Sequence, residues 1–172
     1  MSLRPLLAIS PLASALLLLA AGPAIAASEA AMLQSYVGNY TGGGVLAGGT
    51  TPQTVKCRLN IQSTGPAVLD YTGRCTSGGA GFSMTGIISF AGGKFTAAMS
   101  SSTLGITATV AGQKRGDGVV FASKQNVTMQ GTARAVTSTM ALAGGTIRID
   151  FSATDAKTGK TTSGSIPFTR TN

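Results

Sequence analysis

Few side chains in this sequence have the chemistry of a catalyst. The chain of 172 residues contains no histidine, so Ser–His and Cys–His nucleophile pairs are excluded and the commonest metal ligand is absent. The acidic residues are scattered along the chain: Glu29, Asp70, Asp117, Asp150 and Asp155. A pair of carboxylates for hydrolysis is not expected from that distribution. The composition allows a serine–lysine dyad, but the sequence contains no motif of that kind. We expect a protein that is not an enzyme and that has no metal site.

Two glycine-containing segments match nucleotide-binding loops in part. Residues 42–47, GGGVLA, fit the pattern G-x-G-x-x-A, but a dinucleotide fingerprint needs a helix directly after its glycines. The following residues, GGTTP at 48–52, cannot form that helix. Residues 159–161, GKT, match the end of a phosphate-binding loop, yet Thr154 stands where that loop needs its first glycine. We expect no cofactor, and we interpret residues 38–49 as a bent strand or loop.

The N-terminal residues predict export. Arg4 precedes an apolar run through Leu19, and Ala24 and Ala26 suit a signal peptidase. We expect residues 1–26 to be a cleaved signal peptide; the alternative, a retained membrane anchor, is disfavoured by the short apolar run. Residues 27–172 then form a single domain, periplasmic or secreted.

The charge is moderately basic. Thirteen Lys plus Arg against five Asp plus Glu give +8, and loss of Arg4 with the signal peptide leaves 12 − 5 = +7. These cations are spread along the chain rather than gathered in a stripe, so nucleic-acid binding is not expected. A chain of this charge suits peripheral contact with an anionic envelope surface, such as acidic polysaccharide or lipid headgroups.

Apolar residues recur at every second position through most of the chain, which is typical of half-buried strands. In residues 55–62 the predicted inward residues are Val55, Cys57, Leu59 and Ile61. Later runs predict as inward Leu69, Tyr71, Gly73 and Cys75; Phe82, Met84, Ile88 and Phe90; Leu104, Ile106, Ala108 and Val110; Val127, Met129, Gly131, Ala133 and Ala135; Ile147, Ile149 and Phe151; Ile166 and Phe168. Turn signals separate the runs.

The pattern predicts an all-β fold. We expect an antiparallel up-and-down meander of eight to ten strands closed into a barrel, because closure removes reactive sheet edges. A two-sheet β-sandwich is the alternative. A short helix, capped by Ser28 and ending near Gln34, precedes the first strand.

The two cysteines, Cys57 and Cys75, predict both a disulfide and a strand register. Exported chains meet oxidising conditions, so pairing is expected; two buried thiols are the alternative. If the cysteines lie opposite each other, paired positions sum to 132, residues 65–67 form a three-residue loop, and Arg58 faces Arg74 on the wet face. With Lys56 one wet-face position away, Arg58 and Arg74 form a candidate site for a carboxylate or phosphate. The alternative is plain solvation of these side chains.

The predicted interior is short of bulk. The chain has nine aromatic residues and no tryptophan, and many inward positions are Ala or Gly, so the barrel is expected to retain a cavity. Four methionines, Met84, Met99, Met129 and Met140, either line such a pocket or fill the core.

A short helix, then Gly38-Asn39-Tyr40 at the first strand, then an exported antiparallel meander with one disulfide resembles the lipocalin, or broader calycin, pattern. Gly-x-Trp marks the first strand of that family, and Tyr40 stands in place of the tryptophan. The resemblance implies an up-and-down barrel that binds a small ligand at its mouth. We expect an exported, non-enzymatic binding protein of the cell envelope for a small apolar or anionic ligand. The alternative is a protein-binding module such as a protease inhibitor, as in some small bacterial calycin-like proteins.

Overall fold

The structure is a computed structural model that describes residues 22–49, 51–129 and 131–171. It contains one helix and ten strands: α1 (Gly22–Gln34), β1 (Gly38–Leu46), β2 (Gln53–Gly65), β3 (Val68–Ser77), β4 (Ala80–Ala91), β5 (Lys94–Ser101), β6 (Ile106–Arg115), β7 (Gly118–Met129), β8 (Thr132–Ala143), β9 (Thr146–Asp155) and β10 (Thr161–Thr171). Most of the predicted signal peptide, residues 1–21, lies outside the described residues. Residues 22–26 form the first turns of α1.

Helix α1 begins at Gly22 and not at Ser28 as expected. Proline is favoured in the first turn of a helix, where its missing N–H has no partner to lose. Pro23 occupies that turn, and the alanines after it propagate the helix with little loss of side-chain entropy. Ser28 therefore lies inside the helix and does not cap it.

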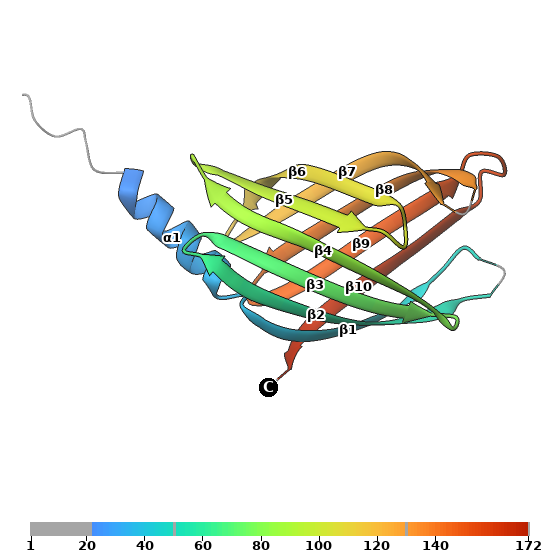
Figure 1. Cartoon of the computed structure of the whole chain (residues 1–172), viewed down its shortest axis with the longest axis horizontal. Helices are drawn as coiled ribbons and strands as arrows, with labels where there is room; N and C mark the ends of the chain where they lie inside the picture. The colour runs from blue at the N-terminus through green and yellow to red at the C-terminus, as the bar shows by residue number, and fades with distance from the viewer. Residues whose placement is uncertain (1–21, 50, 130, 172) are drawn as a thin grey trace, which may run out of the picture.

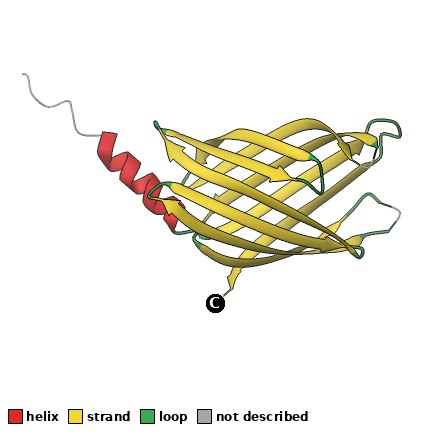
Figure 2. Ribbon diagram, viewed as in Figure 1, coloured by secondary structure: helices red, strands yellow, loops and turns green. Residues whose placement is uncertain are grey.

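The ten strands form a closed antiparallel barrel (Figures 1 and 2). Each strand pairs with the next along the chain, and β1 pairs with β10 to close the sheet. The predicted all-β up-and-down barrel is confirmed, with ten strands, and the structure is not a sandwich. In Figure 1, α1 lies against one end of the barrel. We call this the helix end and the opposite one the open end.

The register predicted from the cysteines is confirmed along most of the β2–β3 hairpin. Cys57 lies opposite Cys75, and their sulfur atoms are bonded at 2.04 Å. The predicted three-residue loop is wrong: the register shifts between Ser63 and Gly65, and Gly65 then pairs with Val68. The bulge takes up one residue of β2, so the turn consists of residues 66 and 67 only.

The glycine-rich segment forms strand β1, as expected, and its glycines permit close packing against β10. A Cβ atom on Gly44 would lie 2.1 Å from the carbonyl oxygen of Ser165, and one on Gly42 would lie 2.7 Å from the ring of Phe168. Only glycine allows these approaches. The segment is a strand that another backbone and an aromatic ring approach closely.

The prediction that residues 127–135 form one strand is wrong. Strand β7 ends at Met129 and β8 begins at Thr132, with Gly131 at φ +75° between them. The hairpin inverts the alternation after the turn. Ala133 consequently has an exposed position on the outer face, and Arg134 takes the inward one.

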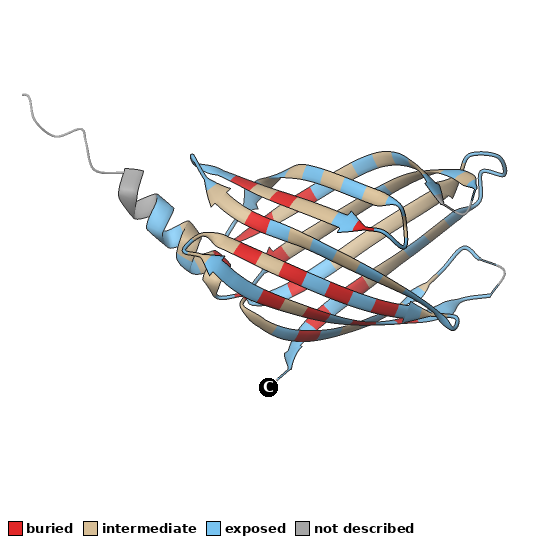
Figure 3. Cartoon of the chain, viewed as in Figure 1, coloured by how far each residue is buried: buried red, intermediate tan, exposed pale blue. Residues whose placement is uncertain are grey.

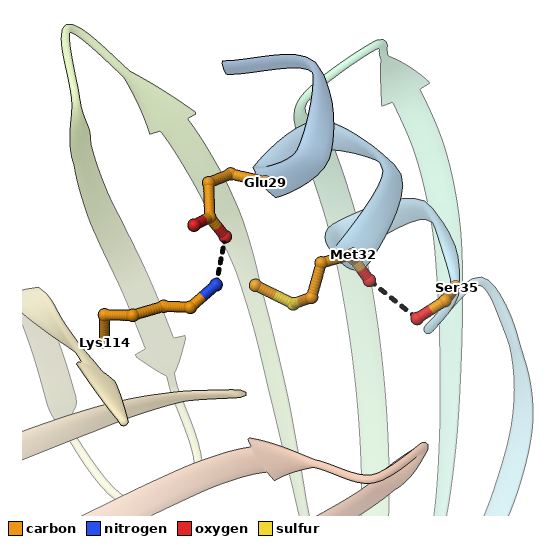
Figure 4. A network of polar contacts seen from close by, with 4 residues as sticks. All are labelled: Glu29, Met32, Ser35 and Lys114. Carbon is orange, nitrogen blue, oxygen red and sulfur yellow. Dashed lines mark hydrogen bonds and ion pairs between the residues drawn. The ribbon is translucent and has the colours of Figure 1, made fainter. Parts of the chain in front are cut away.

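Helix α1 covers its end of the barrel through apolar packing and polar contacts. Leu33 and Tyr36 are buried in the core. Gln34 donates from Nε2 to the carbonyl oxygen of Gly65 at 2.8 Å. Figure 4 shows Glu29 of α1 paired with Lys114 of β6. Residues from distant parts of the sequence thus fix the helix.

Arg170 of the C-terminal strand β10 hydrogen-bonds to the segment that connects α1 with β1. Arg170 donates to the carbonyl oxygens of Ser35 and Val37, the latter at 2.8 Å, and to the hydroxyl of Tyr40 at 2.9 Å. Its guanidinium also lies 5.3 Å from the centre of the Tyr40 ring. Tyr40 in turn donates to the carbonyl oxygen of Tyr36 at 2.9 Å. The helix end is consequently closed and ordered by charge-assisted contacts.

Candidate functional site: the barrel cavity

The barrel encloses a cavity of about 310 Å³, which confirms the expectation of unfilled space. Its lining is mainly aliphatic and aromatic, drawn from every strand. The uncharged polar side chains among the lining residues are few: Ser101, Ser123, Gln125, Ser138 and Thr139, with the Tyr71 hydroxyl. Within the described part of the chain, no charged residue lines the cavity. This environment favours an apolar ligand over a polar one.

Several of these polar groups already have partners in the protein. The hydroxyl of Ser101 donates to the carbonyl oxygen of Ser83 at 2.6 Å. Ser123 and Ser138 hydrogen-bond each other at 2.8 Å across β7 and β8. Because these groups are satisfied, they do not require a polar ligand.

Tyr71 is the largest polar side chain on the cavity surface. Burial raises its pKa to about 12, since desolvation disfavours the charged phenolate. Its hydroxyl lies 3.4 Å from the carbonyl oxygen of Ala98 and would clash with any side chain at Gly86. Tyr71 stays neutral over the physiological range and fills space above a glycine.

Three of the four methionines predicted either to line a pocket or to fill the core line the cavity: Met84, Met99 and Met140. They belong to β4, β5 and β8. The Met129 side chain lies outside the described residues. Flexible thioethers let a cavity wall adapt to ligands of irregular shape.

Along β7 and β9, inward side chains become more exposed from the helix end to the open end. Along β7, Val119 and Phe121 are buried, whereas Ser123, Gln125 and Val127 are half-buried. Strand β9 shows the same change after its buried Ile147. In Figure 3, buried positions on these strands give way to intermediate ones away from α1. On these two strands the cavity wall is therefore more exposed toward the open end, whereas Val55 of β2 and Ser101 of β5 are buried there.

One side of the barrel wall is incompletely paired. The β6–β7 register comprises four pairs, from Gly112 with Phe121 to Arg115 with Gly118. We call the remaining facing stretches, residues 106–111 and 122–127, the β6–β7 seam. A Cβ atom on Gly105 would lie 3.9 Å from the carbonyl oxygen of Thr128, so the two sides approach again beyond the seam. The facing edges of β6 and β7 are not paired with each other along the seam.

The side chains behind the seam are partly reached by solvent. Ile106, Ala108 and Val110 of β6 are half-buried, although all three line the cavity. Val55, Leu59 and Ile61 of β2 also line it and are fully buried. The inward side chains of the cavity wall are thus more exposed on β6 than on β2.

The candidate anion-binding residues lie on the outer face, away from the cavity. Arg58 pairs directly with Arg74, as predicted, and Lys56 pairs with Thr76. All three cations are exposed. The structure thus brings them to one surface patch, and their binding of an anion stays a prediction.

One inward-facing cation near the cavity, Arg134, was not predicted from the sequence. It lies two positions before Val136, a lining residue of β8, and so shares its face. The misplaced hairpin at residues 129–132 concealed it. The sequence signal for this turn is Gly131, because a glycine between two strand patterns marks a turn.

The described residues of α1 form no helix long and apolar enough to cross a membrane. The disulfide is the feature of the structure that bears on compartment, since such bonds persist in oxidising surroundings.

No protein-family model and no curated protein sequence matches this chain. Solved structures do match its fold. Rv2717c from M. tuberculosis is 16% identical over 81% of this chain and 95% of that one, with a TM-score of 0.59. The S-type phycobiliprotein lyase CPES from Guillardia theta is 9% identical over 83% of this chain and 92% of that one, with a TM-score of 0.54. At these identities the similarity is one of fold, a closed antiparallel barrel of the kind that the calycin resemblance implies.

Proposed function

We propose that this protein is an exported, non-enzymatic binding protein whose barrel holds a small apolar ligand. The observation that carries the proposal is the cavity: about 310 Å³ with a mainly apolar lining. Ligand pockets span about 300–1,000 Å³ and are lined mostly by hydrophobic side chains with a few polar groups. A volume at the lower end of that range suits one small molecule or one alkyl chain.

The arrangement of the two ends supports binding rather than simple packing. The helix end is sealed by α1 and the Arg170 contacts, whereas the inward residues of β7 and β9 toward the open end are half-buried. A cup of this form admits a ligand from one side and shields it from water on the other. The likeness to calycin barrels agrees with this use of the fold.

The proposed location is the periplasm or the exterior of the cell. The predicted signal peptide and the Cys57–Cys75 disulfide support it, since both belong to exported chains.

The test is titration of the mature chain, residues 27–172, with the neutral apolar dye N-phenyl-1-naphthylamine, followed by fluorescence. We expect saturable binding of one dye per chain. Ala108→Phe places a ring in the cavity from the seam side and is expected to weaken binding at least about tenfold, a loss of about 1.4 kcal/mol.

Ala111→Phe is the matched control. Ala111 lies on the same strand, is exposed and faces outward, so this variant should bind the dye as the wild type does. Urea unfolding of both variants separates loss of binding from loss of folding, because overpacking also destabilises. Absence of saturable binding by the folded wild type, or equal binding by both variants, contradicts the proposal.

A further inference from the structure

The two facing edges of the β6–β7 seam are each complete on their other side. Strand β6 pairs with β5 through the whole stretch 106–112, and β7 pairs with β8 through 119–129. Toward each other, β6 and β7 pair only as far as Gly112 with Phe121. The stretches 106–111 and 122–127, all described, are therefore two sheet edges inside one barrel wall. Unpaired edges are templates for another strand.

The backbone groups that point into the seam belong to outward-facing residues. In an antiparallel sheet, alternate residues of a strand bond to one neighbour or to the other. The exposed residues Ala47, which follows β1, and Ser163 of β10 exchange both backbone hydrogen bonds, at 2.8 and 2.9 Å. Outward residues thus bond across β1–β10 and, because the strands alternate around the closed sheet, also across β8–β9 and β6–β7. In the seam these residues are Thr107, Thr109, Ala111, Ala122, Lys124 and Asn126.

These seam-facing residues are exposed on both strands. Water can therefore satisfy their N–H and C=O groups while the edges stay unpaired. Each edge presents donors and acceptors in a row with the regular spacing of a strand. Another extended backbone carries the same groups at the same spacing, and main-chain hydrogen bonds supply the affinity when a peptide adds to a sheet edge. The chemistry of the seam thus fits a polypeptide segment.

The two ends of the seam limit the length of such a segment. The pair of Gly112 with Phe121 closes one end. At the other end, a Cβ atom on Gly105 would lie 3.9 Å from the carbonyl oxygen of Thr128. A strand rises about 3.3 Å per residue, so the stretch between these limits accepts about six residues. Because both ends are closed, the segment would enter from the outer surface and leave on that side.

A segment in the seam would have two different faces. The inward neighbours on both strands line the cavity and are mostly apolar, among them Ala108, Val110 and Val127. The outward neighbours are polar or small, with one cation, Lys124. Within the described part of the chain, Lys124 takes part in no ion pair. The surroundings therefore favour a segment in which apolar residues alternate with polar ones, with an acidic residue beside Lys124.

We infer that the β6–β7 seam binds an extended, acidic segment of another polypeptide, which adds to the barrel wall as a strand. Its backbone hydrogen-bonds to the seam-facing groups, its apolar side chains point to the cavity, and its acidic side chain lies beside Lys124. The net charge of +8 favours an acidic partner over a second copy of this chain, since like charges repel. This binding goes beyond the proposed function and does not require it.

The experiment uses a fluorescein-labelled peptide, Val-Glu-Val-Thr-Val-Glu-Val-Thr, titrated with the mature chain at low salt and followed by fluorescence anisotropy. Two control peptides have the same sequence with every second backbone nitrogen methylated, one in each phase, so that each has lost the donors of one edge. We expect saturable binding of the unmodified peptide. At least one methylated peptide should bind at least about tenfold more weakly, since its side chains and charge are unchanged but donors are missing.

Variants of the protein locate the binding. Thr109→Pro removes one seam-facing N–H group without removing a hydrogen bond to β5, and should weaken peptide binding at least about tenfold. Thr109→Val keeps that N–H group and serves as the matched control, so it should bind as the wild type does. Lys124→Gln should weaken binding by about threefold at low salt and leave it unchanged at high salt. Urea unfolding shows whether each variant is folded, and the methylated peptides test the inference on the wild type alone.

The inference is overturned if the folded wild type does not bind the peptide, or if it binds all three peptides equally. Equal affinity of folded Thr109→Pro and Thr109→Val also overturns it, because the peptide then binds elsewhere. Sedimentation of the wild type without peptide tests the other occupant: a dimer that Thr109→Pro dissociates would assign the seam to a second copy and overturn the inference. No outcome depends on dye binding, so this inference and the proposed function can fail separately.

Discussion

The two halves of the barrel wall differ in how completely they are built. On one side β2 and β3 pair over nearly their whole length, share a disulfide and bury every inward side chain from Val55 to Ile61. On the other side β6 and β7 form four register pairs and leave the seam half-exposed. We call the first side the β2–β3 wall.

This difference separates stability from access. A paired, disulfide-linked and fully buried wall resists local opening, whereas unpaired strand edges with exposed backbone groups open at low free-energy cost. The cavity lies between the two sides. The proposed binding function needs both, because a uniformly closed barrel would trap or exclude a ligand and a uniformly open one would not hold its shape.

The largest expected effect is on the β2–β3 wall. Replacing both cysteines, Cys57→Ala with Cys75→Ala, should lower the free energy of unfolding by about 3 kcal/mol, since the bond closes a loop of moderate length in the unfolded chain. Urea unfolding without reductant measures the loss. A loss of under about 1 kcal/mol would indicate that strand pairing alone holds this wall.

The second prediction sets one isoleucine of each side against the other. Ile61 on β2 is 2% exposed and Ile106 on β6 is half-buried. Ile61→Ala should cost about 2 kcal/mol more than Ile106→Ala, because a cavity opens only where the side chain is enclosed. Equal losses in thermal or urea unfolding would remove the distinction between the two sides.

The third prediction uses the pKa of Tyr71 in the β2–β3 wall. Because its folded pKa is raised to about 12 from 10.0, the unfolded chain ionises first as the pH rises. The stability that the neutral phenol contributes is present below about pH 10 and is lost as the pH rises toward 12, by about 1.4 kcal/mol at pH 11.

Tyr71→Phe removes this titration. Unfolding measured at about pH 9 and pH 11 should show a drop about 1.4 kcal/mol smaller for Tyr71→Phe than for the wild type. The comparison cancels the titration of the other tyrosines and of the lysines, which the two proteins share. An identical pH dependence in the two proteins would mean that water reaches the hydroxyl and that this wall is less closed than described.

The smallest effect concerns the outer face of the same wall. Arg58 and Arg74 lie directly opposite each other, and like charges in that position repel by a few tenths of a kcal/mol. Arg58→Gln with Arg74→Gln should raise the free energy of unfolding by up to about 0.5 kcal/mol.

The same variant tests the predicted anion site formed with Lys56. Binding to anionic phospholipid vesicles at low salt should weaken in the double variant if the patch binds headgroups. Unchanged vesicle binding, or none by the wild type, would leave these residues as solvated surface cations.

The sequence predicted the β2–β3 wall in detail because several signals agree there. Alternation, a turn containing proline and two cysteines of the same phase fix one register, and a slip by one residue would move both cysteines to the outer face. The bulge near Ser63 was not predicted, because the register arithmetic allows no extra residue in one strand.

The rim of the cavity could not be predicted in the same way. Residues 127–135 keep an alternating pattern through the β7–β8 turn, since Gly131 and Ala133 fit an inward phase as small residues. The turn inverts that phase and brings Arg134 inward. No sequence feature predicts that pairing between β6 and β7 stops at the seam, because strand separation depends on the curvature of the whole barrel.

Amide hydrogen exchange of the mature chain, with and without bound apolar ligand, tests the central claim most directly. We expect slow exchange in the β2–β3 wall under both conditions. We expect fast exchange, in the free protein, of those amides of residues 106–111 and 122–127 that point to the seam and not to β5 or β8, slowed when N-phenyl-1-naphthylamine occupies the cavity. Two results would contradict the difference between the two sides: equal protection of both in the free protein, or ligand-dependent protection confined to β2 and β3 around Arg58 and Arg74.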